Sequence, residues 1–240
     1  MGYLIDSHCH LHDRDFFSEE QAEKMLKKAQ EKDVKKIICI GTSHEDSLVA
    51  RDFANKHENV YWTYGIHPEY AGQDWKLEGE PIAIGEVGLD YHYDSYNRSA
   101  QIKLFEEMLQ LAIDNDLPLS FHVREAFDDF FPVVANFPTA CGVVHSFSDN
   151  KKNLKRILTE TDFYIGVNGM ATYSTLPTPP IERTILETDA PFLTPKPFRG
   201  IINEPAYVAA IAKWLSEKIG LDYKIIERKT TKNVRELFNI

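Results

Sequence analysis

Short apolar runs alternate with helical segments along the whole of this chain, and that order restricts it to few folds. In the segment 19–32, apolar residues recur at helical spacing: Ala22, Met25, Leu26 and Ala29. The run KKIICIG at 35–41 follows directly and has the composition of a buried strand. A strand, helix, strand order of this kind predicts parallel strands, because each helix carries the chain back to the start of the next strand.

The same order continues to the end of the chain. We predict eight strands, at residues 3–8, 35–41, 60–65, 81–87, 117–123, 142–146, 163–167 and 183–187. We predict helices at 19–32, 45–56, 99–115, 126–135, 150–159 and 204–219, with a small helical addition at 222–240 docked through Asn233, Val234, Leu237 and Phe238. These units favour an α/β fold, a distorted TIM-like (β/α)8 barrel. The segments 68–80 and 169–181 are short, and the second is rich in proline, so we expect two shortened helical connections.

Length and charge limit the domain organisation and the mode of binding. A chain of 240 residues with 43% hydrophobic content buries one full core, so residues 1–240 form a single domain. The formal net charge of −10 excludes a broad basic surface. It does not exclude a nuclease, because a divalent ion in a cleft receives a phosphate that the rest of the surface repels.

The cysteines and the start of the chain predict the compartment. The three cysteines form no CxxC pair, which favours a reducing compartment. The chain begins directly with a predicted strand, and no apolar run approaches the length of about 18 residues that a membrane span needs. We therefore expect a cytoplasmic protein with no membrane contact and no evident obligate protein partner.

Metal-binding side chains lie where the predicted strands end: His8, His10, Glu86, His122, His145 and Asp189. The carboxyl ends of barrel strands meet on one face, which is where such barrels carry out chemistry. His8 and His10 share one side of their strand, whereas Cys9 points to the other and is expected in the core. A buried carboxylate such as Glu86 is costly unless a cation offsets its charge, and no arginine is clearly placed to do so. The pattern predicts a metal-dependent hydrolase.

Other polar residues leave alternatives open. His67, just before Pro68, either donates a hydrogen bond to a substrate oxygen or caps its loop. Arg124 and Arg199 are candidates for phosphate contacts. We expect the remaining histidines of the loops and helices at the surface: His12, His44, His57 and His92. The aromatic cluster after the fourth strand either stacks nucleobases or packs over the rim of the barrel: Tyr91, His92, Tyr93 and Tyr96.

Seven motifs occur in a characteristic order: DSHCHLH, YGIHPEY, AIGEVGLDY, FHVREA, GVVHSFS, ETDAPFLTP and RGIINEPAYV. In this order they resemble the TatD-type metal-dependent deoxyribonucleases of the amidohydrolase superfamily. The resemblance extends from Asp6 to the NVRELF segment near the C-terminus, so it covers nearly the whole chain.

The resemblance implies two divalent metal ions in a distorted barrel. It assigns one ion to His8, His10 and Asp189, the other to His122 and His145, and a bridging position to Glu86. It implies that His67 contacts a substrate phosphate. The ions are Mg²⁺, Mn²⁺ or Zn²⁺, because imidazoles favour zinc whereas carboxylates tolerate magnesium.

Two ions so placed lower the pKa of a water that attacks an electrophile, and Asp189 is expected to accept its proton. We predict catalytic roles for Asp189, Glu86 and His67, and substrate binding by His67, Arg124 and Arg199. The resemblance implies a deoxyribonuclease that acts at a 3′ end of single-stranded DNA or at a damaged site. A D-aminoacyl-tRNA deacylase or another ester or amide hydrolase is the alternative, and a barrel with structural ions that binds a protein partner is a third hypothesis.

The chain departs from the family pattern at two positions. His12 stands where an aspartate is usual, and Phe198 replaces a common histidine before Arg199. These changes leave the metal ligands intact but leave the shape of the substrate groove open.

Overall fold

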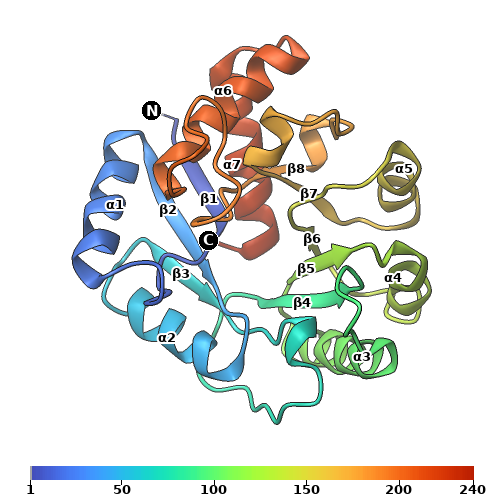
Figure 1. The fold of residues 1–240 in the computed structure, drawn as a ribbon. Helices are drawn as coiled ribbons and strands as arrows, with labels where there is room; N and C mark the ends of the chain where they lie inside the picture. The colour runs from blue at the N-terminus through green and yellow to red at the C-terminus, as the bar shows by residue number, and fades with distance from the viewer. Residues whose placement is uncertain (1) are drawn as a thin grey trace.

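The computed structural model describes residues 2–240 and has eight strands surrounded by helices (Figure 1). The strands are β1 (Leu4–Cys9), β2 (Val34–Ile40), β3 (Val60–Thr63), β4 (Ile84–Asp90), β5 (Leu119–Arg124), β6 (Gly142–Val144), β7 (Tyr164–Val167) and β8 (Thr184–Leu186). Every paired strand is parallel to its neighbour. The predicted α/β class with parallel strands is therefore confirmed.

The strands form two sheets rather than one closed barrel. One sheet has the order β1-β2-β3 and the other the order β4-β5-β6-β7-β8. Single bridges join them, Tyr64 with Ile84 and Cys9 with Ala190. A continuous ladder around the barrel is thus not formed. One reason is local, because β8 ends at Leu186 and the positive φ of Asp189 (59°) turns the chain out of the extended conformation that a ladder requires.

Side chains hold β1 against the end of β8 where the ladder is missing. The buried carboxylate of Asp6 accepts hydrogen bonds from the Thr188 amide at 2.8 Å and from the Thr188 hydroxyl at 2.6 Å. The Ser7 hydroxyl donates to the Leu186 carbonyl at 3.0 Å. Burial raises the pKa of Asp6 well above its ordinary value, against the opposing effect of the Thr188 hydrogen bonds. These contacts fix the first strand beside the last one.

The helices are α1 (Glu19–Glu31), α2 (His44–Ala54), α3 (Arg98–Asp114), α4 (Phe127–Val134), α5 (Lys151–Glu160), α6 (Val208–Ile219) and α7 (Tyr223–Phe238). They surround the strands in Figure 1. The two expected short connections are confirmed, because β3 is followed only by the 3₁₀ turn Pro68–Tyr70, and β7 only by the 3₁₀ turns Gly169–Thr172 and Ile181–Arg183. In residues 2–240 none of the helices combines the length and the apolar character needed to cross a membrane.

The C-terminal helix α7 confirms the helical addition expected at 222–240. It has 16 residues and packs against β1 and β8. Of its predicted docking residues, Asn233, Val234 and Phe238 are buried and Leu237 is partly buried. The Asn233 amide donates to the Thr184 carbonyl at 2.7 Å, which ties the helix to β8.

An aromatic cluster between the strands and the outer helices orients β5. Phe121 of β5 packs edge-on against Phe105 of α3 and Phe130 of α4, with ring centroids 5.9 Å and 5.4 Å apart. Successive side chains of a strand point to opposite faces. Because Phe121 points outward to the helices, His122 points to the interior that the two sheets enclose.

Strand β4 starts later than predicted. We expected residues 81–87, whereas β4 runs from Ile84 to Asp90, so Glu86 lies within the strand and not at its end. His122 likewise lies within β5. Pro81 explains part of the shift, because it has no amide hydrogen to donate to a ladder. The later end of β4 also places Asp90 on the same face as Glu86.

Two glycines allow the backbone to approach closely around Glu86 and His122. A Cβ on Gly65 would lie 2.1 Å from the Glu86 nitrogen, and a Cβ on Gly88 would lie 2.0 Å from the His122 carbonyl oxygen. Gly88 also has a φ of +146°, which side chains disfavour. Glycine is therefore required at both positions for these strands to meet.

The surface placement expected for His12 is wrong. The side chain is fully buried, and its Nε2 lies 3.0 Å from Asp46 Oδ1. Burial opposes the charge, but the hydrogen bond to Asp46 raises the pKa of His12 to about 9. The segment after β1 lies close to α2, and this brings the His12 ring within hydrogen-bond distance of the Asp46 carboxylate. His44 and His57 are partly exposed and His92 is exposed.

We predict that His12→Asn lowers the free energy of unfolding by about 1–3 kcal/mol near pH 6, because Asp46 Oδ1 loses its charged partner while Oδ2 keeps its hydrogen bonds with Thr42. The pKa of His12 is raised from 6.5 to about 9 on folding, so its contribution is full below pH 6.5 and is lost as pH rises through 9. The difference between wild type and variant in urea unfolding should therefore shrink between these pH values. A difference that stays constant would contradict a charged pair, and Asp46→Asn serves as the matched variant.

Candidate metal centre

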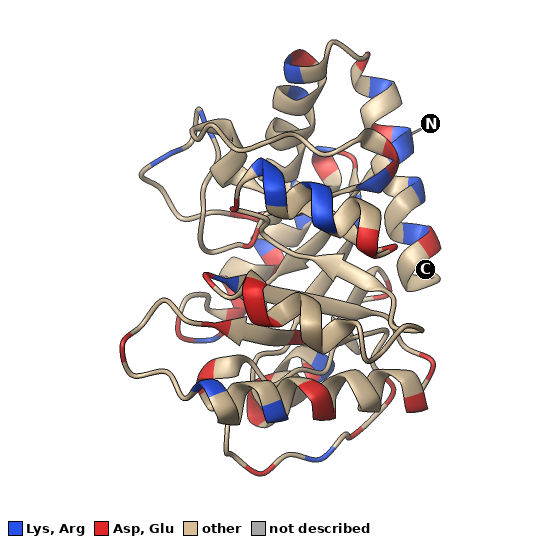
Figure 2. Ribbon diagram, turned by 90° about the vertical axis from the view of Figure 1, so that its right-hand side faces the viewer, with Lys and Arg blue, Asp and Glu red and all other residues tan. Residues whose placement is uncertain are grey.

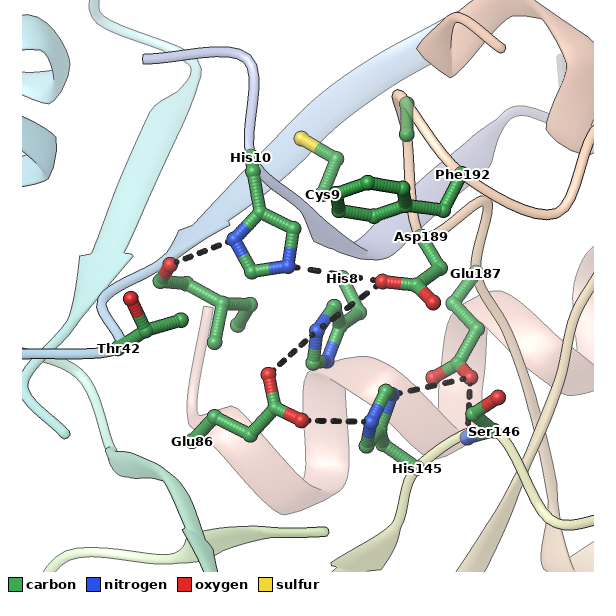
Figure 3. Close-up of polar contacts among 12 residues, drawn as sticks. His8, Cys9, His10, Thr42, Glu86, His145, Ser146, Glu187, Asp189 and Phe192 are labelled. Carbon is green, nitrogen blue, oxygen red and sulfur yellow. Dashed lines mark hydrogen bonds and ion pairs between the residues drawn. The ribbon is translucent and has the colours of Figure 1, made fainter. Parts of the chain in front are cut away.

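The six predicted metal ligands come together at one end of the strand ring. His8 lies on β1, Glu86 on β4 and His122 on β5. His10 and His145 directly follow the ends of β1 and β6, and Asp189 lies three residues after the end of β8. Figure 3 shows His8, His10 and His145 pointing toward the carboxylates of Glu86 and Asp189. Five of the six residues are buried, and the His122 side chain is 17% exposed. The sequence-based choice of ligands thus corresponds to one spatial cluster.

The first group of donors has the spacing that a metal ion requires. His8 Nε2 lies 3.4 Å from Glu86 Oε2 and 3.6 Å from Asp189 Oδ1, and His10 Nε2 lies 3.5 Å from Asp189 Oδ1. Donors about 2.05 Å from a tetrahedral ion are about 3.3 Å apart. Within residues 2–240, the buried His8 Nε2 has no hydrogen-bond partner. These residues therefore fit an ion better than they fit a hydrogen-bonded network.

The second group is drawn together around Glu86. His122 Nδ1 lies 2.6 Å and His145 Nε2 lies 2.9 Å from Glu86 Oε1. These are hydrogen-bond distances, so the imidazoles would move apart by a few tenths of an ångström to hold an ion there. Glu86, His122 and His145 form one possible ligand group, and His8, His10 and Glu86 another. Glu86 belongs to both, which fits the bridging position implied by the sequence.

The outer nitrogens of two ligands face carboxylates that the sequence analysis missed. His122 Nε2 lies 2.9 Å from Asp90 Oδ2, and His145 Nδ1 lies 3.6 Å from Glu187 Oε1. A carboxylate on the far nitrogen fixes the ring and its tautomer, and so directs the other nitrogen toward a metal. For Asp90 the signal was the period of two along a strand, because Asp90 lies four residues after Glu86. Glu187 lies beyond the end of β8, where that period does not apply.

The two central carboxylates are ionised. Burial raises the pKa of Glu86, but the nearby His145, with hydrogen bonds from His122 and His145, lowers it well below the ordinary value. Burial also raises the pKa of Asp189, and the hydrogen bond with His10 brings it below the ordinary value. Deprotonated carboxylates are the form in which these residues bind a metal ion.

His67 lies beside the second group and is neutral. Its ring is 4.5 Å from that of His122, and burial together with His122 lowers the pKa of His67 to about 3. His67 Nδ1 accepts a hydrogen bond from the Glu69 amide, so the proton is on Nε2. His67 therefore caps its loop, which is one of the two roles that the sequence left open. Its neutral Nε2–H stays a candidate donor to a substrate oxygen, the other role.

A cavity of about 540 Å³ opens over the ligands. His67, Arg124 and Tyr93 are among the residues that line it. Arg199 does not belong to the described lining, and its guanidinium lies over the Tyr173 ring at 4.1 Å. Of the predicted substrate contacts, the structure therefore brings His67 and Arg124 to the metal ligands but not Arg199.

A second, larger hollow of about 960 Å³ lies along α7 and the first residues of β1. Its described lining contains Glu227 and Glu236 but no histidine or cysteine. It also lacks every residue of the ligand cluster. Size alone therefore does not mark the functional site, and the chemistry of the donors does.

Comparison with known proteins agrees with this site. The family model described as TatD related DNase matches residues 5–239. An uncharacterized metal-dependent hydrolase from Buchnera aphidicola is 32% identical over 257 residues, covering 99% of this chain and 97% of that protein. The 3′-5′ ssDNA/RNA exonuclease TatD from Pantoea ananatis is 29% identical and covers 91% of this chain and 93% of its own. The crystal structure of YJJV, a TatD homologue from Escherichia coli K12, superposes with a TM-score of 0.85 at 28% identity, over 99% of this chain and 98% of that one.

We predict that Glu86→Gln folds but loses bound metal, because a neutral amide cannot offset the charge of ions held by four imidazoles. Metal content after dialysis, measured by mass spectrometry, should fall well below that of wild type. Glu125→Gln is the matched control, since Glu125 is exposed and contacts only His92 among the described histidines. Wild-type metal content in Glu86→Gln would overturn the bridging assignment.

Proposed function

This chain belongs to the TatD-related DNase family of metal-dependent hydrolases, and we propose that it hydrolyses phosphodiester bonds of single-stranded DNA, from a 3′ end or at a damaged site. One observation carries the proposal: Glu86 is buried, its lowered pKa favours the carboxylate, and it belongs to two possible metal-ligand groups. An open cavity lies over these groups. The name of the Pantoea relative supports the polarity and the single-stranded substrate.

The site fits two divalent ions, which when bound would lower the pKa of a water and neutralise charge on a phosphate. Asp189 lines the cavity, and its carboxylate is ionised. It therefore accepts the proton of the attacking water. Asp90 and Glu187 hold the outer nitrogens of His122 and His145, so those rings keep their orientation during the reaction.

The substrate side of the site has few charged contacts. His67 Nε2 lies 4.0 Å from Glu86 Oε1 and offers a neutral N–H to a phosphate oxygen, whereas Arg124 offers a cation. In the side view of Figure 2, Lys and Arg segments are interspersed with Asp and Glu segments along the helices. With a net charge of −10, binding of DNA must therefore depend on the cavity itself.

The same residues suit other esters, so the nature of the electrophile is the open part of the proposal. A D-aminoacyl-tRNA deacylase would use Asp189 and Glu86 on a carbonyl instead of a phosphorus. A lactonase of the type that bridges its metals with a modified lysine is disfavoured, because Glu86 occupies the bridging position. We place the enzyme in the cytoplasm and in the processing of damaged DNA, and its three free cysteines support a reducing compartment.

The test compares substrates with each metal in turn. We predict that the protein loaded with Mg²⁺, Mn²⁺ or Zn²⁺ degrades 3′-labelled single-stranded DNA faster than it deacylates D-aminoacyl-tRNA. Asp189→Asn should keep its fold and lose about 100-fold or more in kcat, because the amide cannot accept a proton. Faster deacylation by the wild type would replace the nuclease with the deacylase, and near-normal kcat for Asp189→Asn would move the general base elsewhere.

We predict a shallow dependence of KM for DNA on salt. The log–log slope should correspond to about two or three phosphates, at about 0.7 per phosphate for single strands. Arg124→Ala should reduce the slope by about one phosphate, because Arg124 lines the cavity. Arg199 lies outside the described cavity lining, so Arg199→Ala should leave the KM for DNA near the wild-type value. A steep slope would contradict binding through the cavity alone and would indicate a basic groove elsewhere on the protein.

A further inference from the structure

A smaller hollow adjoins the cavity over the metal ligands. It has a volume of about 210 Å³ and shares His67, Glu69, Asp90 and Tyr93 with the larger cavity. His67 and Asp90 both contact His122, so the hollow begins one residue away from the ligand cluster. A group bound there would lie directly beside a phosphate positioned at the metal centre.

Two tyrosines exposed to solvent form part of this hollow. The Tyr93 and Tyr96 side chains line it and are 63% and 41% exposed. Tyr91 stacks on Tyr96 at 4.5 Å with an angle of 17° between the rings, although it does not belong to the described lining. Large exposed aromatic surface beside a polar site is typical of a binding surface.

A hydrogen bond with Asp129 fixes Tyr91, the inner ring of the Tyr91–Tyr96 stack. The Tyr91 hydroxyl donates to Asp129 Oδ2 at 2.8 Å, and the Arg98 guanidinium donates to Asp129 Oδ1 at 2.6 Å. Tyr96 therefore rests on a ring that is fixed to the N-terminal ends of α3 and α4. A platform that is already ordered loses less entropy when a flat ligand binds to it.

Two polar side chains of the hollow form hydrogen bonds within the protein. Gln101 bonds through both ends of its amide to the backbone of Asp90, at 2.9 Å each. Asn97 Oδ1 accepts from the Ala100 amide at 3.1 Å. The lining thus offers the aromatic surface of two tyrosines, a kind of surface that binds flat aromatic ligands with little sequence preference.

Charge points to the same kind of ligand. At a net charge of −10 the protein gains little affinity by neutralising phosphates, so a nucleic acid needs contacts of another type. Base stacking on aromatic side chains is the sequence-tolerant alternative. We propose that Tyr93 and Tyr96 form a subsite for one unpaired nucleobase next to the scissile phosphate; this rests on the proposed hydrolysis of DNA.

The proposal explains a preference for single strands. A base that is paired and stacked within a duplex cannot enter a hollow of about 210 Å³ beside the metal centre. Only a base that is already unpaired, at a strand end or a lesion, reaches it without the energetic cost of unpairing.

The test is a double-mutant cycle between protein and DNA. The protein variants are Tyr93→Leu/Tyr96→Leu and, as matched control, Tyr223→Leu, a partly buried tyrosine at the start of α7. The substrates are a short oligonucleotide and two versions with an abasic residue on one or the other side of the scissile phosphate.

For the wild type, we expect one of the two abasic positions to lower kcat/KM by about tenfold. The double variant should lose about tenfold in kcat/KM on the normal oligonucleotide, and its kcat/KM should not fall further on the substrate with that abasic position. Tyr223→Leu should behave as wild type. Equal losses of the double variant on normal and abasic substrates would overturn the subsite. If wild-type protein hydrolysed none of the oligonucleotides, the proposed function itself would fail, which is a different result.

A binding measurement gives a readout apart from activity. Asp189→Asn protein should quench the fluorescence of 2-aminopurine placed at the sensitive position of the oligonucleotide, because stacking quenches this base. The quenching should disappear when Tyr93→Leu/Tyr96→Leu is added to Asp189→Asn. Undiminished quenching in the combined variant would refute the tyrosine subsite.

Discussion

A buried carboxylate among imidazoles is the interaction on which the rest of this structure depends. Glu86 lies within 3.4 Å of nitrogens from His8, His122 and His145, and it is almost completely buried. An isolated ionised carboxylate would be very costly in this position. The surrounding nitrogens, and the ions that they fit, offset that cost, and they tie β1, β5 and the end of β6 to β4.

The fold accommodates this centre through local departures from a regular barrel. The ladder is interrupted on both sides of the β1–β3 sheet, and it is bridged by single residue pairs. At one interruption the hydrogen bonds between Asp6 and Thr188 add to two backbone bonds, from Asp189 to His8 and from His10 to Ala190, and the Asp189 carboxylate lies 3.5 Å from His10 Nε2. At the other, Gly65 permits close approach to the backbone of Glu86. The gaps in the strand ladder thus lie at the same places as Asp189 and Glu86 of the donor cluster.

The surroundings of the metal centre contain two kinds of groups that could contact a substrate, polar groups and aromatic rings. The metal ligands, Arg124 and neutral His67 suit a single phosphate, while Tyr93 and Tyr96 present aromatic surface beside it. A protein of net charge −10 cannot rely on a basic face. If the protein hydrolyses DNA as proposed, these constraints favour recognition of one phosphate and one flat ring, which suits ends and unpaired positions better than continuous duplex.

The sequence by itself determined the order of strands and helices, the two short connections and the six residues of the donor cluster, because hydrophobic period and donor chemistry are local properties. Only the tertiary structure decided the rest. The register of β4 placed Glu86 inside a strand and added Asp90, and the packing of α2 buried His12 against Asp46. The interrupted ladder and the position of Arg199 outside the cavity also depend on contacts between residues far apart in the chain, which no local pattern records.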